Sequence, residues 1–88
     1  MFYVYVLQSS DEFYIGYSSD LRSRFASHNR GDNPSTRGRQ WQLVYYEAYV
    51  AEKFARHRER VLKHNGRSRR ILMDRIKQSL ETNSLVAG

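Results

Sequence analysis

The chain opens with two short apolar segments separated by polar residues. Phe2 to Gln8 and Phe13 to Tyr17 are rich in aromatic and β-branched residues, and the four residues between them favour turns. This alternation predicts a β-hairpin. Closing it over those four residues pairs Tyr5 with Gly16 and puts Tyr14 diagonally opposite Tyr5 on the same face, within reach of its ring.

Helical spacing replaces this alternation after residue 20. The range Leu21 to Asn29 repeats apolar residues on one stripe, and the Ser-Ser-Asp run at 18–20 supplies candidate N-caps. A loop with three arginines and the chain's one proline follows over Arg30 to Arg39. Trp41 to Val50 is again rich in aromatic and β-branched residues, and it predicts a third strand.

Two helices complete the predicted domain. The first runs from about Ala51 to His64 and is expected to end at the Asn-Gly pair 65–66 in a left-handed conformation. Ser68 is the candidate cap of a second helix that ends at Leu80, and residues 81–88 are expected to form a disordered tail. We therefore predict one α+β domain over residues 1–80. It has a small, three-stranded, mostly antiparallel sheet flanked by helices, in the order β-β-α-β-α-α.

Composition excludes several classes of protein. The 88 residues include no cysteine, which rules out disulfide frameworks, thiolate zinc sites and cysteine nucleophiles. The longest apolar run, Phe2 to Leu7, is far shorter than the roughly 20 residues of a membrane span, and no basic stretch precedes it as in a secretory signal. The cytoplasm is the location that remains by default.

Charge points to a polyanionic partner. The net charge is +6, and ten of the fifteen cations lie between Lys53 and Lys77, where Glu59 and Asp74 are the acidic residues. Such a basic face is the usual footprint of nucleic-acid binding. A merely solvated surface is the structural alternative. A membrane surface fits less well, because aromatic residues are not clustered on the basic helices.

Several short motifs follow one another in a specific order. They are Tyr3-Val4-Tyr5, Tyr14-Ile15-Gly16, Leu21-Arg22-Ser23-Arg24 with His28, Leu43-Val44-Tyr45-Tyr46-Glu47, and Ala55 followed by Glu59-Arg60-Val61-Leu62-Lys63. In this order and at these distances they resemble the GIY-YIG nucleases over about residues 3 to 77. The similarity is greatest to the small stand-alone members, which carry the nuclease domain alone. Repair, recombination and mobile-element functions all use this domain type. The catalytic domain of the DNA-repair nuclease UvrC is a more distant relative.

The resemblance implies hydrolysis of a DNA phosphodiester with one divalent metal ion, Mg²⁺ or Mn²⁺. It assigns Tyr5 to contact or deprotonate the attacking water, Tyr14 to position water or phosphate, and Arg24 to bind phosphate. His28 falls where the family has a residue that assists proton transfer, and Glu59 matches the carboxylate that holds the metal. One carboxylate is enough for Mg²⁺, which keeps several waters and accepts phosphate oxygens.

Activation of the tyrosine is the difficult step in this scheme. Free tyrosine has a pKa of about 10, so Tyr5 needs a nearby cation to act as a phenolate. Tyr17 stands where repair nucleases have a lysine, and Gly16, opposite Tyr5, is expected to leave room for substrate. The expected substrate-binding residues are Gly16, Tyr17, Arg37, Arg39, Lys63, Arg67 and Arg70.

Each assignment has a structural alternative. The two motif tyrosines are also ordinary strand residues, and Arg24 is also a normal exposed helix residue. His28 is compatible with a hydrogen-bonded histidine at the edge of the core, and Glu59 with an i,i+4 ion pair to Lys63.

The predicted function is a metal-dependent endonuclease that nicks DNA with a preference for shape rather than sequence, such as branched, nicked or single-stranded DNA. The expected partner is nucleic acid, with DNA favoured over RNA, and neither a membrane nor an obligate protein partner. The alternatives are a catalytically weak nucleic-acid-binding module of the same fold, and a protein-interaction domain with an acidic partner.

Overall fold

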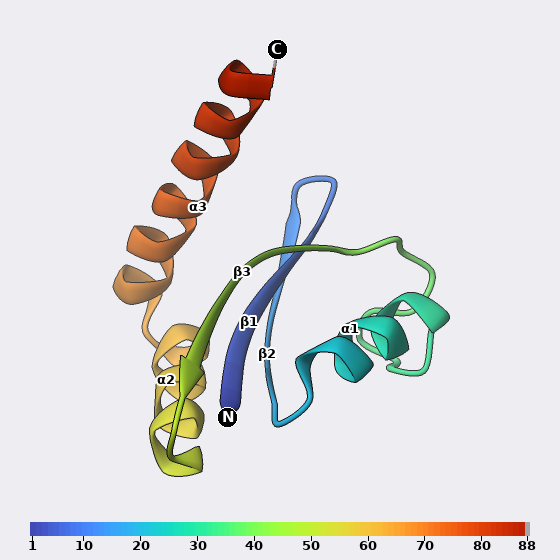
Figure 1. The fold of residues 1–88 in the computed structure, drawn as a ribbon, viewed down its shortest axis with the longest axis vertical. Helices are drawn as coiled ribbons and strands as arrows, with labels where there is room; N and C mark the ends of the chain where they lie inside the picture. Colours follow the sequence, from blue (N-terminus) through green and yellow to red (C-terminus); the bar gives the residue numbers. More distant parts are fainter. Residues whose placement is uncertain (88) are drawn as a thin grey trace.

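The computed structural model describes the backbone of residues 1–87 and the side chains of residues 1–81. Within this part of the chain, the elements follow the order β-β-α-β-α-α (Figure 1). They are β1 (Phe2–Ser9), β2 (Glu12–Ser18), α1 (Leu21–Arg30), β3 (Gln42–Tyr49), α2 (Glu52–His64) and α3 (Gly66–Ala87). The predicted α+β class and element order are confirmed.

The three strands form an antiparallel sheet with β1 in the centre, in the order β2-β1-β3. The hairpin has the predicted register, with Tyr5 opposite Gly16. Its connection is shorter than the predicted four residues, because Ser9 still pairs with Glu12. Ser10, in the resulting two-residue turn, has a positive φ of 53°, a conformation that tight hairpin turns require.

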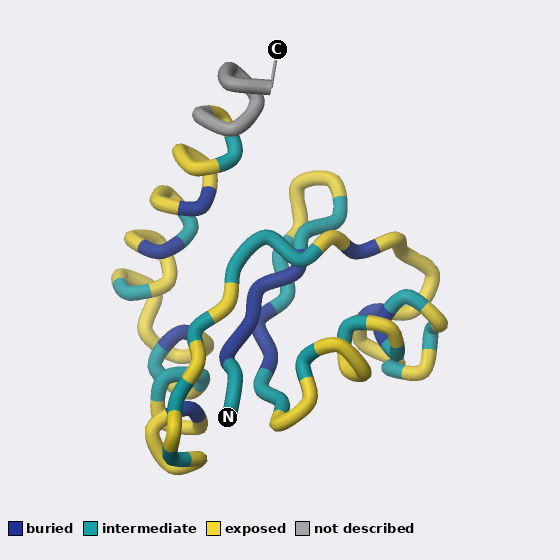
Figure 2. Tube along the Cα trace, viewed as in Figure 1, coloured by how far each residue is buried: buried dark blue, intermediate teal, exposed yellow. Residues whose placement is uncertain are grey.

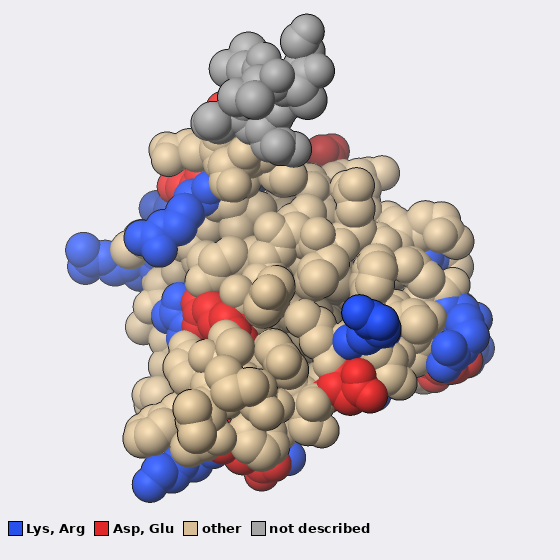
Figure 3. Space-filling view, in the orientation of Figure 1, with Lys and Arg blue, Asp and Glu red and all other residues tan. Residues whose placement is uncertain are grey.

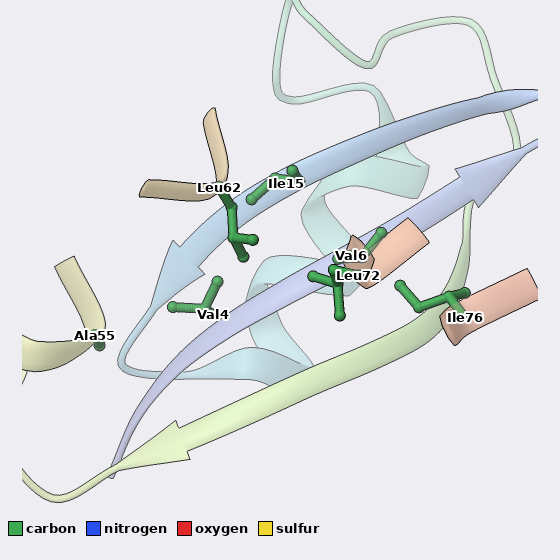
Figure 4. Packing of buried hydrophobic residues seen from close by; sticks show 7 residues of the cluster. All are labelled: Val4, Val6, Ile15, Ala55, Leu62, Leu72 and Ile76. Carbon is green, nitrogen blue, oxygen red and sulfur yellow. The ribbon is translucent and has the colours of Figure 1, made fainter. Parts of the chain in front are cut away.

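Helices cover both faces of the sheet: α2 and α3 lie on one side and α1 on the other (Figure 1). The larger core joins three residues of the hairpin to four residues of the helices: Val4, Val6, Ile15, Ala55, Leu62, Leu72 and Ile76 (Figure 4). A smaller cluster on the α1 side contains Tyr5, Leu7 and Trp41. Burial is therefore greatest along β1, which is covered from both sides (Figure 2).

A bulge interrupts the pairing of β1 with β3. Val6 pairs with Tyr45, but Leu7 pairs with Leu43, so Val44 is the extra residue. Val44 and Tyr45 consequently both pack against the α2–α3 core, whereas Leu43 packs in the cluster on the α1 side. A bulge of this kind re-aims the side chains that follow it.

The helix boundaries differ from the prediction at the junction of α2 and α3. Asn65 is extended, with φ −112°, and Gly66 is the first residue of α3 rather than a left-handed end of α2. The Oδ1 atom of Asn65 accepts a hydrogen bond from the backbone N–H of Ser68 at 3.0 Å, so Asn65, not Ser68, caps α3.

The far end of α3 also differs from the prediction. The helix continues past Leu80 to Ala87, where a tail was expected from residue 81, because neither proline nor glycine interrupts residues 81–87. Gly88, the end of that predicted tail, lies outside the described residues. None of the helices in the described part of the chain is long and apolar enough to cross a membrane.

Arg58 has a partner that the helical pattern could not reveal. Its Nε and Nη2 atoms donate to the carboxylate of Glu47 on β3, at 2.9 and 3.0 Å. The hydroxyl groups of Tyr45 and Tyr49 donate to the same carboxylate. Burial opposes ionisation, but these hydrogen bonds, that from Arg58 above all, hold the pKa of Glu47 below its usual range. The cluster anchors α2 to β3 directly beside Glu59.

Candidate active site

Tyr5 lies at one end of a buried chain of hydrogen bonds. Its hydroxyl is 2.8 Å from Nε2 of His28, and Nδ1 of His28 is 2.8 Å from Oγ1 of Thr36. Tyr5 is 1% exposed, and the other two residues are 0% exposed. The structure thus brings together two residues predicted for the site, one from β1 and one from α1, and adds a third that was not predicted.

Tyr14 completes an aromatic group around the histidine. Its ring centroid lies 4.8 Å from that of His28 and 6.4 Å from that of Tyr5. The ring of Trp41 lies on its other side, at 6.3 Å. The predicted diagonal placement of Tyr5 and Tyr14 is therefore confirmed.

Gly16 has a different role from the one expected. A Cβ atom added there would lie 2.3 Å from both Cζ and the hydroxyl oxygen of Tyr5. The space beside Gly16 is filled by the Tyr5 ring itself and is not room for substrate. Any side chain at this position would displace the phenol from its place beside His28.

Burial keeps both Tyr5 and His28 neutral, and nearby charges modify its effect. Burial raises the pKa of Tyr5 to about 12, the charges of Tyr14 and Glu59 act in the same direction, and Arg24 opposes them. Burial also lowers the pKa of His28, as does the positive charge of Arg24. At neutral pH the pair is therefore an intact phenol beside an uncharged imidazole.

Glu59 and Lys63 approach the cluster from α2, on the other side of the sheet. Their side chains form an ion pair of 3.2 Å, the i,i+4 pair that was the structural alternative for Glu59. Lys63 Nζ is also 5.9 Å from the centre of the Tyr14 ring. The Glu59 side chain is 22% exposed, and Lys63 contacts its Oε2 atom. A single accessible carboxylate fits Mg²⁺, which is commonly held by one or two carboxylates with phosphate oxygens.

Two open grooves flank the site. One, of about 640 Å³, runs between β2 and the start of α3 and is lined by Phe13, Tyr14, Ile15, Lys63, Gly66, Arg69, Arg70 and Met73. The other, of about 550 Å³, contains Tyr17, Arg24 and Arg56. Tyr17 also donates to Glu52 at 2.9 Å, and the Arg56 guanidinium lies 4.6 Å from the centre of its ring. Both grooves thus combine aromatic rings with cations.

Three arginines predicted to bind substrate lie apart from the cluster. Arg37 donates through Nε to the carbonyl of Gly31 at 3.1 Å, and Arg39 forms an ion pair of 2.9 Å with Glu12, the first residue of β2. Arg67 is exposed on the first turn of α3. In Figure 3, Lys and Arg side chains stand out beside α3 and around α1, with a largely uncharged surface between them.

Sequence comparison assigns this arrangement to a family. The family model of the GIY-YIG catalytic domain matches residues 1–71. This range includes both tyrosine motifs, Arg24, His28 and Glu59. The chain belongs to the GIY-YIG family. The resemblance seen in the sequence is confirmed, and the family typically uses a divalent metal ion.

Within the GIY-YIG family, this chain is similar to UPF0213 proteins of about the same length. A UPF0213 protein of Clostridium perfringens is 35% identical over 86 residues, which are 94% of this chain and 92% of that protein. One of Haloquadratum walsbyi is 38% identical over 71 residues, 77% and 80% of the two chains. The solution structure of a UPF0213 protein from Bacillus halodurans superposes with a TM-score of 0.54 and 32% identity, covering 88% and 86% of the two chains. These names state no substrate.

Proposed function

We propose that this GIY-YIG domain is a metal-dependent endonuclease that hydrolyses phosphodiester bonds in DNA. The observation that carries the proposal is the buried Tyr5–His28 hydrogen bond of 2.8 Å, whose tyrosine is subject to the opposing charges of Arg24 and Glu59. It joins a proton donor to a neutral proton acceptor beside two groups of the kind that bind a phosphate and a metal ion. That combination suits hydrolysis by an activated water.

Each residue has a defined task in this scheme. Arg24, exposed on α1, binds the phosphate and stabilises the negative charge that develops on its oxygens. The charge of Arg24 acts on Tyr5 and opposes the rise of its pKa by burial, so a phosphate bound by Arg24 would lie near the phenol. Tyr5 takes the proton of the attacking water and passes its own to Nε2 of His28. Glu59 is the residue that would hold a divalent ion, Mg²⁺ or Mn²⁺, which when bound would supply positive charge for phosphodiester hydrolysis.

The grooves favour a flexible or unpaired strand over an intact duplex. The groove beside Tyr14 carries Lys63 and Arg70 for phosphates and Phe13 for contact with a base or sugar. Cations interleaved with aromatic rings are typical of single-strand binding, because every base offers a face for stacking. Contacts of this kind position the backbone without reading its sequence. We therefore expect activity on branched, nicked or single-stranded DNA.

A nicking assay on supercoiled plasmid and labelled branched DNA, with Mg²⁺, Mn²⁺ or EDTA, tests the proposal. Glu59→Gln removes the charge without changing shape, and Tyr5→Phe removes the hydroxyl. Each is expected to lower the rate by about 100-fold or more while DNA binding persists. Asp74→Asn, at an exposed acid on α3, is the matched control and should nick like wild type.

The second candidate function is a binding module without catalysis. It is favoured by the burial of Tyr5, whose side chain is only 1% exposed. Absence of cleavage, together with a gel shift that weakens steeply with salt and ignores metal, would replace the nuclease with this module. Equal cleavage by wild type and Glu59→Gln would trace the signal to contamination and also refute the proposal.

A further inference from the structure

Thr36 is a fully buried residue in the loop between α1 and β3, and the scheme above assigns it no task. Its side chain is 0% exposed, although it lies in a loop whose neighbours at positions 34, 35 and 37 are exposed. Its hydroxyl contacts the Nδ1 atom of His28, on the side of the ring opposite to Tyr5. A buried threonine in this position controls how the imidazole is held.

The loop is built so that Thr36 is delivered to the histidine. The side chain of Asn29 clamps the backbone of Trp41: Oδ1 accepts from the N–H at 2.6 Å, and Nδ2 donates to the carbonyl at 3.0 Å. The indole Nε1 of Trp41 then donates to the carbonyl of Thr36 at 2.9 Å, and the Thr36 N–H donates to the carbonyl of Asn33 at 3.1 Å. The backbone of Thr36 is thus held through both of its polar groups.

The direction of the hydrogen bonds follows from counting protons. A neutral imidazole carries one N–H and one lone pair, and a hydroxyl carries one proton. Every donor in this series of hydrogen bonds has an acceptor in one direction. In that direction Tyr5 donates to Nε2 of His28, Nδ1–H donates to Thr36, and the Thr36 hydroxyl donates to the Asn33 carbonyl, which lies 3.4 Å away. In the reverse direction Nε2–H would donate to Tyr5, and the buried Tyr5 proton would lose its acceptor.

We infer that Thr36 is a positioning residue that holds the proton of His28 on Nδ1, so that the lone pair of Nε2 faces the Tyr5 hydroxyl. Its consequence for catalysis rests on the proposed nuclease function. In that reaction the attacking water gives a proton to the Tyr5 oxygen while Tyr5 gives its own proton to Nε2 of His28. The resulting imidazolium keeps its Nδ1–H bond to Thr36, so no group has to rotate during the transfer.

The tautomer can be measured on the free protein by ¹H–¹⁵N NMR of ring-labelled histidine above the pKa of His28. In wild type, we expect Nδ1 of His28 to have the ¹⁵N chemical shift of a protonated ring nitrogen and Nε2 that of an unprotonated one. Thr36→Val keeps the shape but removes the acceptor, so the Nε2–H form, which free histidine prefers, should appear. Thr36→Ser should restore the wild-type pattern. Ser35→Ala, at the exposed neighbour, should leave it unchanged.

Nicking by the same proteins provides the second readout. Thr36→Val should slow cleavage by about 10- to 100-fold, the size of effect seen when the hydrogen-bond partner of a metal-bound histidine is removed, and Thr36→Ser should recover most of it. A wild-type His28 protonated on Nε2, or a tautomer unchanged in Thr36→Val, would overturn the inference. If Thr36→Val does not fold, the wild-type spectrum still decides. The predicted tautomer without cleavage by wild type would refute the proposed function alone.

Discussion

The close approach of Gly16 to Tyr5 makes Gly16→Ala the most discriminating single substitution. Glycine in a strand interior normally weakens the strand, so alanine would be expected to stabilise it by about 0.5–1 kcal/mol. Here the new Cβ would lie 2.3 Å from Cζ and the hydroxyl oxygen of Tyr5, a separation that real Cβ atoms essentially never show. The ring must therefore move, although it is surrounded by the buried cluster with His28.

Two costs follow from that movement. Overpacking a well-packed core costs about 1–3 kcal/mol, and separating the buried Tyr5–His28 pair leaves polar groups without partners, at about 1–3 kcal/mol. After subtraction of the normal gain from alanine, we expect Gly16→Ala to lower the free energy of unfolding by about 3 kcal/mol. That is a large fraction of the stability of a domain this small.

Urea unfolding followed by tryptophan fluorescence measures this effect directly, because the chain has one tryptophan, Trp41, and it is 6% exposed. Gly66→Ala is the matched control. Its Cβ would meet nothing closer than 3.8 Å, at a helix position where alanine is preferred, so its stability should stay equal or rise by up to about 1 kcal/mol. The same substitution type is thus expected to act with opposite signs at two sites.

A double-mutant cycle identifies the cause. Tyr5→Leu removes the ring atoms that Gly16→Ala would meet, so in that background the alanine should cost less than about 0.5 kcal/mol. A Gly16→Ala protein as stable as wild type would refute the steric reasoning. An equal penalty in both backgrounds would refute it as well, because the cost would then not arise from the Tyr5 ring.

Two further predictions concern the Glu47–Arg58 ion pair and the titration of His28. Arg58→Met should lower the free energy of unfolding by about 2 kcal/mol, as measured by urea unfolding of the variant. Breaking a fully buried ion pair costs about 3–5 kcal/mol, and we expect less here because the Glu47 and Arg58 side chains are 15% and 33% exposed. The lowered pKa of His28 means that the folded state binds its proton less readily than the unfolded state. This contribution to stability is therefore present above the ordinary histidine pKa of about 6.5 and is lost as pH falls through the lowered folded value. Urea midpoints at about pH 7.5 and about pH 5 should differ by less in His28→Gln than in wild type, and an equal difference would contradict the assignment.

The hairpin and its register were predictable because they depend on local alternation. Once the turn was placed, each residue of Phe2 to Gln8 had one face and one partner, and the placement of Tyr5 opposite Gly16 followed. The α2–α3 junction was not predictable in the same way. Asn65 and Ser68 are both good N-caps, and only the backbone conformation, extended at Asn65, decides between them.

The site was predictable as far as its residues belong to a motif or a helical stripe. Tyr5 and His28 met that condition, whereas Thr36 did not. A threonine in a loop rich in glycine and arginine has no periodicity, and its burial depends on the clamp between Asn29 and Trp41. The role of Arg58 needed the register of β3, including its bulge, which places Glu47 on the α2 side.

The position of β2 explains how one site draws on both layers of the fold. Tyr5 and Tyr14 face the α1 side of the sheet, whereas Glu59 and Lys63 belong to α2 on the opposite side. They approach one another because β2 is an edge strand, beyond which α2 side chains can reach around the sheet, as Lys63 does to the Tyr14 ring. The position of Glu59, the proposed metal ligand, relative to Tyr5 therefore depends on how α2 packs on the sheet. The Glu47–Arg58 cluster controls that packing at the residue next to Glu59. Stability and the geometry of the proposed nuclease site are thus coupled through one helix.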